Sequence, residues 1–301
     1  MRMFIRIVLT ALLILSVLST HSIAALKLRH IVSVYQDVQE KQLKQPEGVA
    51  CGKGASFVVA DTGNGRLVLY TFQGKTAQAL QEIKVPQLTY PVRVQIGARG
   101  NIFALDEKQR RIVRLSPAGE FQGYLEPVGL PGTTTLVPRS FKIDNNGTIY
   151  ILDIFSKNVV VLDAEGKFLK NIAFPEHYGF ISDLSVDFKE TVLLIDSVES
   201  IIYSAPKDSK KFSPLTASMK DNVNFPTNIE TDKRGTIYLV DQNGGDIIIV
   251  GQDGSFQGRQ LAMGWAEGLL RYPAQACVNE KGEFFVADRS NNRVQVYLIA
   301  E

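Results

Sequence analysis

The chain has 301 residues, with 33 Lys and Arg against 31 Asp and Glu, and its formal net charge is +2. Apolar residues make up 45% and charged residues 21%, which is ample for a packed core. Proteins that neutralise phosphates need a basic excess or a dense basic patch, so we expect no nucleic acid partner.

The first residues predict an export signal. Arg2 and Arg6 precede a short apolar run, residues 7–18, and small residues follow up to Ala24. A basic start, a short apolar run and a small-x-small site are typical of a secretory signal peptide. An uncleaved membrane anchor is the alternative, although the apolar run is short for a membrane span.

We therefore expect residues 1–24 to be a signal peptide and residues 25–301 to form one mature domain. Removal of the two arginines leaves 31 basic residues against 31 acidic ones, so the mature chain would be neutral. The protein would be periplasmic or secreted, and it would contact a membrane only if the signal stays uncleaved.

One pattern with a period in the forties then repeats six times. Each copy ends its second apolar run with an aspartate, and a proline or isoleucine stands fifteen residues earlier. The aspartates are Asp61, Asp106, Asp153, Asp196, Asp241 and Asp288, at intervals of 45, 47, 43, 45 and 47 residues. A repeat of this length made of short strands predicts the blades of a β-propeller.

Each copy is expected to contain four antiparallel strands. A short strand after the proline leads through a Gly-containing turn to an apolar run such as TIYLVD, residues 236–241. Because that run is almost wholly apolar, it should be buried on both faces. A third strand and a more polar fourth follow, so we predict an all-β, six-bladed propeller.

The two ends of the mature chain predict how the ring closes. The sixth copy stops after its third strand, residues 293–301, and a strand-like segment, Leu26–Tyr35, precedes the first copy. We expect this N-terminal strand to pair with the last blade, which removes the open sheet edges.

The pattern P-x-G, G-x-apolar, A-D-x-x-N-x-R resembles the NHL repeat, most closely in the copies that begin at Pro46 and Pro273. The resemblance covers essentially the whole mature chain and implies a six-bladed propeller of the exported bacterial type. Proteins with NHL propellers bind RNA or proteins, and some relatives are lyases or hydrolases. The resemblance therefore implies the fold but does not indicate which activity the protein has.

The charged residues of the repeat are expected to be structural. Arg66, Arg111 and Arg293 each lie five residues after a repeat aspartate, across the turn between the second and third strands. Each arginine could bond back to its aspartate, as structural Arg–carboxylate pairs do.

The residues just after each proline should converge at one mouth of the central channel. The candidate ligands are Glu47, Arg93, Ser140, Asp183, Asn228 and Gln275. Oxygen ligands around an axis suit Ca²⁺, and calcium-dependent lactonase-like propellers look similar here, although Arg93 would repel a cation. A mouth that binds water or a small anion, and a solvent-filled channel without ligand, are the alternatives.

The number of histidines and the positions of the cysteines limit which metal sites and covalent links the chain can form. His30 and His177 are the histidines of the mature chain, too few for a catalytic zinc site with three protein ligands. Cys51 and Cys277 lie on the inner strands of blades that ring closure makes neighbours, so a disulfide is possible. Two buried free thiols are the alternative.

Aromatic residues in the loops between blades, Tyr90, Tyr178 and Trp265, suggest a partner-binding face. They could equally cap the space between blades. Our main hypothesis is a non-catalytic scaffold that binds a protein or glycan, with no catalytic residue and no cofactor other than possible Ca²⁺. The alternative is a calcium-dependent, lactonase-like hydrolase at the channel mouth. The oligomeric state is left open.

Overall fold

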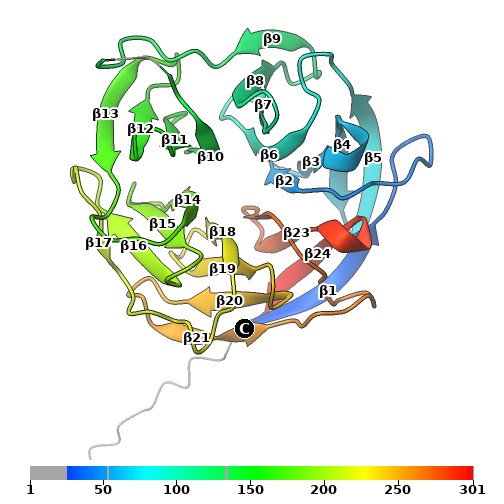
Figure 1. Ribbon diagram of the computed structural model, residues 1–301. Helices are drawn as coiled ribbons and strands as arrows, with labels where there is room; N and C mark the ends of the chain where they lie inside the picture. Colours follow the sequence, from blue (N-terminus) through cyan, green and yellow to red (C-terminus); the bar gives the residue numbers. More distant parts are fainter. Residues whose placement is uncertain (1–25, 53, 133–134, 301) are drawn as a thin grey trace, which may run out of the picture.

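Six four-stranded antiparallel sheets form a ring around a central axis (Figure 1). The computed structural model describes residues 26–52, 54–132 and 135–300. This architecture confirms the all-β, six-bladed propeller predicted from the repeat. The predicted signal peptide, residues 1–24, lies outside the described residues. Within the described part of the chain, no helix is long and apolar enough to cross a membrane.

The blades follow one another along the chain, and in each the first strand lies nearest the axis (Figure 1). Blade 1 contains β2 (Gly48–Cys51), β3 (Ser56–Asp61), β4 (Arg66–Gln73) and β5 (Thr76–Ile83). Blade 2 contains β6 (Pro91–Ile96), β7 (Ile102–Asp106), β8 (Arg111–Leu115) and β9 (Phe121–Tyr124). Blade 3 contains β10 (Pro138–Ile143), β11 (Ile149–Asp153), β12 (Asn158–Leu162) and β13 (Phe168–Ala173).

The second half of the ring repeats this order. Blade 4 contains β14 (Ile181–Val186), β15 (Val192–Asp196), β16 (Ile201–Ala205) and β17 (Ser213–Pro214). Blade 5 contains β18 (Pro226–Thr231), β19 (Ile237–Asp241), β20 (Asp246–Val250) and β21 (Phe256–Gln260). Blade 6 contains β22 (Ala276–Val278), β23 (Glu283–Asp288), β24 (Arg293–Ala300) and β1 (Lys27–Val34).

The N-terminal strand closes the ring as predicted. β1 pairs with β24 in antiparallel register, from Lys27 opposite Ala300 to Val34 opposite Val294. The first described strand therefore completes the last blade (Figure 1). β1 thereby covers the outer edge of β24.

The core lies between neighbouring blades, because the second strand of each blade is buried on both faces. All five residues of β7, β11, β15 and β19 are buried. Between blades 1 and 6, the ring of Phe57 stacks on Tyr70 at 4.9 Å and packs on Phe285 at the same distance. This two-sided burial explains why the second strands carry almost no polar residues before their terminal aspartate.

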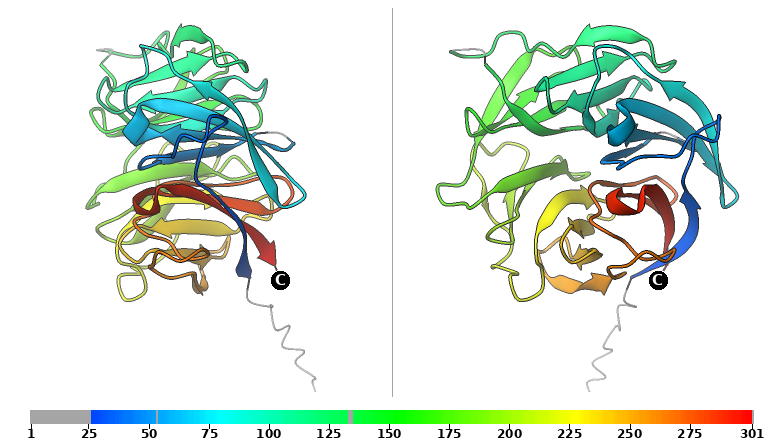
Figure 2. Two further views of the ribbon diagram at one scale, coloured as in Figure 1. Left: turned by 90° about the vertical axis from the view of Figure 1, so that its right-hand side faces the viewer. Right: turned by 45° about the vertical axis from the view of Figure 1, so that its right-hand side comes forward.

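The ring has two faces. The inner strands begin at one face, which also carries the loops between second and third strands and the loops between blades; we call it the proline face. Two short 3-10 turns, η1 (Thr62–Asn64) and η2 (Arg289–Asn291), lie on this face, at the same edge of the ring (Figure 2). The opposite, hairpin face carries the turns between first and second strands.

Candidate functional site

The six repeat aspartates are structural tethers. Each is buried and accepts a backbone N–H from the segment just before the inner strand of its own blade, at 2.6–3.0 Å. The donors are the N–H groups of Lys44, Thr89, Tyr90, Val137, Gly179, Phe180, Asn224, Phe225 and Arg271. One carboxylate per blade thus fixes the path of the chain from one blade into the next.

The repeat arginines divide into two kinds. Arg66 Nε lies 2.6 Å from Asp61 Oδ2, and Arg293 Nε lies 2.7 Å from Asp288 Oδ2, as predicted. The prediction for Arg111 is wrong, because this side chain is exposed and its guanidinium lies 4.7 Å from the ring centroid of Tyr124. Its expected partner already accepts backbone N–H groups, so no donor is needed there.

Four of the predicted channel ligands form a buried belt that links the inner strands. Ser140 Oγ donates to Asp183 Oδ1, and Asn228 Nδ2 donates to Asp183 Oδ2 at 2.5 Å. The N–H of Ile229 also donates to Asp183 Oδ2, at 3.0 Å. The N–H of Ala276 in turn donates to Asn228 Oδ1 at 2.9 Å. Blades 3 to 6 are therefore connected in series, and both oxygens of the one carboxylate are engaged.

Gln275 extends this belt past blade 1. Its amide contacts the backbone of Val94 in blade 2, with Oε1 and Nε2 each 3.4 Å from their partners. Gly48 of blade 1 makes room for it, because a Cβ there would lie 3.2 Å from Gln275 Oε1 and 2.8 Å from the Cβ of Ala60. We call Ser140, Asp183, Asn228 and Gln275 the inner belt.

The remaining two candidates do not join the inner belt. Glu47 pairs with Arg289 at 3.3 Å, and burial raises the pKa of its carboxyl group. Arg93 reaches from blade 2 toward blade 5, where its Nη2 lies 3.4 Å from the carbonyl oxygen of Thr227. The structure therefore does not gather the calcium ligand set. No group of three or more His, Cys, Asp or Glu suited to a metal ion occurs among the described residues.

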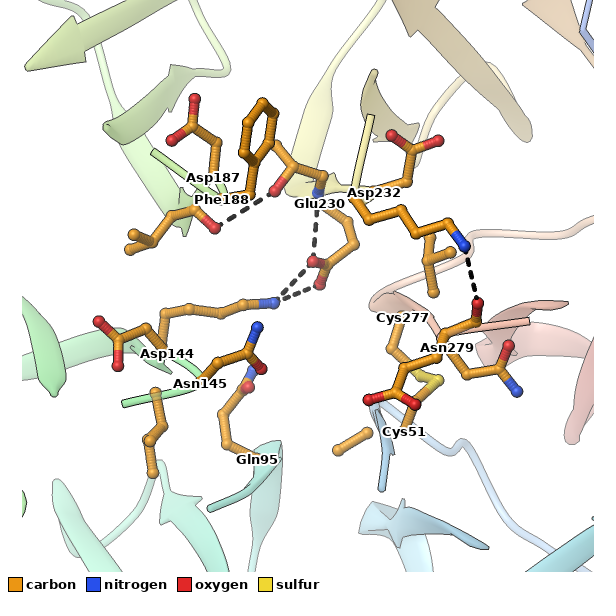
Figure 3. Close-up of a pocket in the computed structure, with 18 of the residues that line it drawn as sticks. Cys51, Gln95, Asp144, Asn145, Asp187, Phe188, Glu230, Asp232, Cys277 and Asn279 are labelled. Atoms are coloured by element: carbon orange, nitrogen blue, oxygen red, sulfur yellow. Dashed lines mark hydrogen bonds and ion pairs between the residues drawn. A yellow bond between two sulfur atoms is a disulfide. The ribbon is translucent and has the colours of Figure 1, made fainter. Parts of the chain in front are cut away.

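A cavity of about 400 Å³ opens at the hairpin face instead, lined by residues of all six blades (Figure 3). An ion pair crosses it, because Lys142 Nζ of blade 3 lies 2.7 and 2.6 Å from the carboxylate oxygens of Glu230 in blade 5. Around the rim, Phe188 is 55% exposed. The cavity can hold a small polar molecule.

The acidic and amide side chains on the rim of this cavity mainly bond the backbone of their own hairpin turns. Asp144, Asp187, Asp232 and Asn279 occupy equivalent hairpin positions in blades 3 to 6. The Oδ1 atom of each accepts N–H groups two and four residues later, for example from Asn146 at 2.8 Å. These side chains hold the hairpins in shape. The sequence analysis missed the cavity because the hairpins between first and second strands were interpreted only as turns.

The two cysteines form a disulfide in the wall of the cavity (Figure 3). Cys51 of β2 and Cys277 of β22 are joined at a Sγ–Sγ distance of 2.07 Å, across 226 residues of sequence. The bond covalently links the first and last blades, next to the place where β1 closes the ring. It is the pairing that the sequence suggested.

The three predicted partner-binding aromatics differ in exposure. Tyr90 and Tyr178 are half-buried and pack against apolar clusters between blades. Tyr178 also meets Phe174 edge to face at 5.7 Å. Trp265 alone of the three is exposed, at 72%. Trp265 is therefore the most exposed of the three, whereas the two tyrosines also pack between blades.

The fold and its periodic tethers define the class of protein: a six-bladed β-propeller closed by its N-terminal strand. The NHL repeat model matches residues 270–297, so the last blade carries an NHL repeat, which confirms the resemblance seen in the sequence. The brain tumor protein of Drosophila melanogaster is 27% identical over 144 residues, 46% of this chain. The match spans 13% of that relative's length.

Solved structures share the fold. Virginiamycin B lyase from Staphylococcus aureus is 12% identical with a TM-score of 0.63, over 91% of this chain and 100% of the lyase chain. A gluconolactonase from Xanthomonas campestris is 12% identical with a TM-score of 0.66, over 89% and 88%. Hydrazine synthase from Kuenenia stuttgartiensis is 16% identical with a TM-score of 0.57, over 85% and 83%. At such identities the likeness extends to the fold alone.

Proposed function

We propose that the protein is an exported, non-catalytic scaffold that binds a protein partner through its proline face, with Trp265 at the centre of the contact. The observation that carries the proposal is the loop from Leu261 to Pro273, between blades 5 and 6. Met263, Trp265 and Tyr272 of this loop are 44%, 72% and 42% exposed. Arg271 lies over the indole ring at 5.0 Å.

The backbone of this loop is fixed although its side chains are exposed. Arg293 Nη2 donates to the carbonyl oxygens of Ala266 and Leu269, both at 2.8 Å. Gln295 donates to Leu269 O at 2.6 Å and accepts from the N–H of Gly268 at 2.7 Å. A large aromatic residue held in place before binding loses little conformational entropy when a partner covers it.

The composition of this surface is that of a protein interface. Trp, Tyr, Arg and Met are enriched where proteins bind each other, and Trp and Arg carry much of the binding energy. Other exposed apolar side chains, Ile154, Phe155 and Val198, lie in loops between second and third strands on the same face. The hydrolase alternative has less support, because protein donors already engage both oxygens of Asp183.

The test is affinity capture from extract of the source cells, with the wild-type protein and two variants. We expect Trp265→Ala to lose a bound protein that wild type retains. Phe188→Ala is the matched control, because Phe188 is also exposed and apolar but lies on the hairpin face. A protein captured equally well by Trp265→Ala would contradict the proposed face, and capture that survives protease treatment of the extract would indicate a glycan instead.

The proposal includes export. N-terminal sequencing of the protein recovered from its source should show a chain that starts at Ala25, since the signal pattern ends at Ala24. A chain that still starts at Met1 and sediments with membranes would support the anchor alternative.

A further inference from the structure

Two arginines interact electrostatically at the channel mouth of the proline face. Arg93 comes from β6 in blade 2 and Arg139 from the start of β10 in blade 3, so they lie on adjacent inner strands. Arg93 crosses the axis to blade 5, where Thr227 lies. The guanidinium of Arg139 lies 4.7 Å from the ring centroid of Phe180. Both side chains are half-buried.

Neither guanidinium has a counter-ion within the described part of the chain. Arg93 contacts only carbonyl oxygens, that of Val92 at 3.0 Å and that of Thr227 at 3.4 Å. The Nε atoms of Arg93 and Arg139 are shielded from solvent and have no hydrogen-bond partner among the described residues. The same holds for the hydroxyl of Thr227. A half-buried charge with unused donors is costly unless an anion meets it.

The neighbouring acidic residues do not act as counter-ions for Arg93 and Arg139. Glu47 is near but is already paired with Arg289. Glu107 is exposed and acts on Arg139 only through its field. Burial lowers the pKa of Arg139, Glu107 raises it, and the like charge of Arg93 lowers it again. Asp183 is a third carboxylate near the axis, and both of its oxygens accept hydrogen bonds within the inner belt. None of these three carboxylates forms a hydrogen bond or ion pair with Arg93 or Arg139 in the described part of the chain.

We propose that Arg93, Arg139 and Thr227 form a binding site for a small oxyanion, either the carboxylate of an organic acid or inorganic phosphate. Guanidinium groups present paired N–H donors that match such oxyanions, and the hydroxyl adds a donor from the opposite blade. The site does not depend on the partner proposed for Trp265.

The test is calorimetric titration of the purified protein at low ionic strength with sodium phosphate and, separately, with sodium succinate. We expect wild type to bind at least one of them, and the stronger of the two identifies the source. Arg93→Gln and Arg139→Gln should each weaken binding about tenfold or more. Arg114→Gln is the matched control, because its Nε is also shielded and unpartnered but lies on β8, away from the channel.

Glu107→Gln should change the affinity for the anion in the opposite direction to the arginine variants. Removing this exposed negative charge should tighten binding without disturbing the fold, because the side chain is on the surface. Circular dichroism establishes that each variant is folded, and if an arginine variant does not fold, Glu107→Gln still decides. No binding of either anion to wild type would overturn the proposal. Equal affinity of wild type, Arg93→Gln and Arg139→Gln would overturn it as well.

Discussion

Asp246 lies directly opposite Asp241 across the β19–β20 pair in blade 5. In blades 1, 2 and 6 the same position holds an arginine, opposite the repeat aspartate. The side chain of Asp246 is buried, with 2% exposed. Its Oδ2 lies 2.9 Å from Arg259 Nε, whereas Oδ1 has no partner among the described residues. Burial, reinforced by the charge of Asp241, raises the pKa of Asp246 to about 6.

Asp246 should therefore make the stability of the protein depend on pH. A carboxyl group whose pKa is higher in the folded state stabilises the protein below its unfolded pKa of 3.8, and this contribution is lost as pH rises toward about 6. We expect Asp246→Asn to raise the free energy of unfolding by about 1–3 kcal/mol at pH 7 and by nearly nothing at pH 3.8 or below. Urea unfolding across this range measures it, with the exposed Asp221→Asn as control. A benefit of equal size at both ends of the range would contradict the assignment.

Arg66 and Arg111 occupy the same repeat position but should differ in their effect on stability. Arg66 is fully buried, where it bonds Asp61 and Asp37 and lies 3.1 Å from Glu82. Arg66→Met leaves buried carboxylates without a counter-ion, so we expect a loss of about 3–5 kcal/mol in the free energy of unfolding. Arg111→Met, at the exposed position, should cost less than about 0.5 kcal/mol. Chemical unfolding of both variants measures the difference, and similar losses would show that the repeat position acts alike in both blades.

The disulfide between Cys51 and Cys277 should stabilise the closed ring. It limits the unfolded chain over a loop of more than 200 residues, a constraint that typically contributes about 2–4 kcal/mol. We expect the double variant Cys51→Ser, Cys277→Ser to melt at a lower temperature than wild type. Added reductant should lower the melting temperature of wild type to that of the variant and leave the variant unchanged. A wild-type protein insensitive to reductant under unfolding conditions would contradict this contribution.

Periodicity made the architecture predictable, because the same physical task recurs in every blade. The carboxylate of Asp61 holds the chain before its inner strand, and the same contact in each blade requires an aspartate at constant spacing. The closing strand was predictable for a related reason. In blade 6 the outer edge of the third strand pairs with β1, as the strand-like segment before the first copy indicated.

The candidate site was less predictable, because it depends on side-chain reach between blades. Convergence after the prolines was expected, but not that Ser140 and Asn228 would engage the carboxylate of Asp183 on both sides. The pair between Lys142 and Glu230 joins residues 88 positions apart, and no local pattern marks it. Local spacing reports the backbone path, whereas such contacts depend on rotamers and side-chain length.

A substitution in the inner belt distinguishes the scaffold hypothesis from the calcium-dependent hydrolase hypothesis. Asp183 accepts three hydrogen bonds from Ser140, Asn228 and the backbone of Ile229, so Asp183→Ala leaves buried donors unpaired. We expect it to lower the free energy of unfolding by about 2–4 kcal/mol, by the same amount in calcium and in chelator. Ser140→Ala removes one donor and should cost about 1 kcal/mol, which calibrates the effect of a single bond. If calcium raised the melting temperature of wild type but not of Asp183→Ala, the carboxylate would be a metal ligand, and the hydrolase alternative would replace the scaffold.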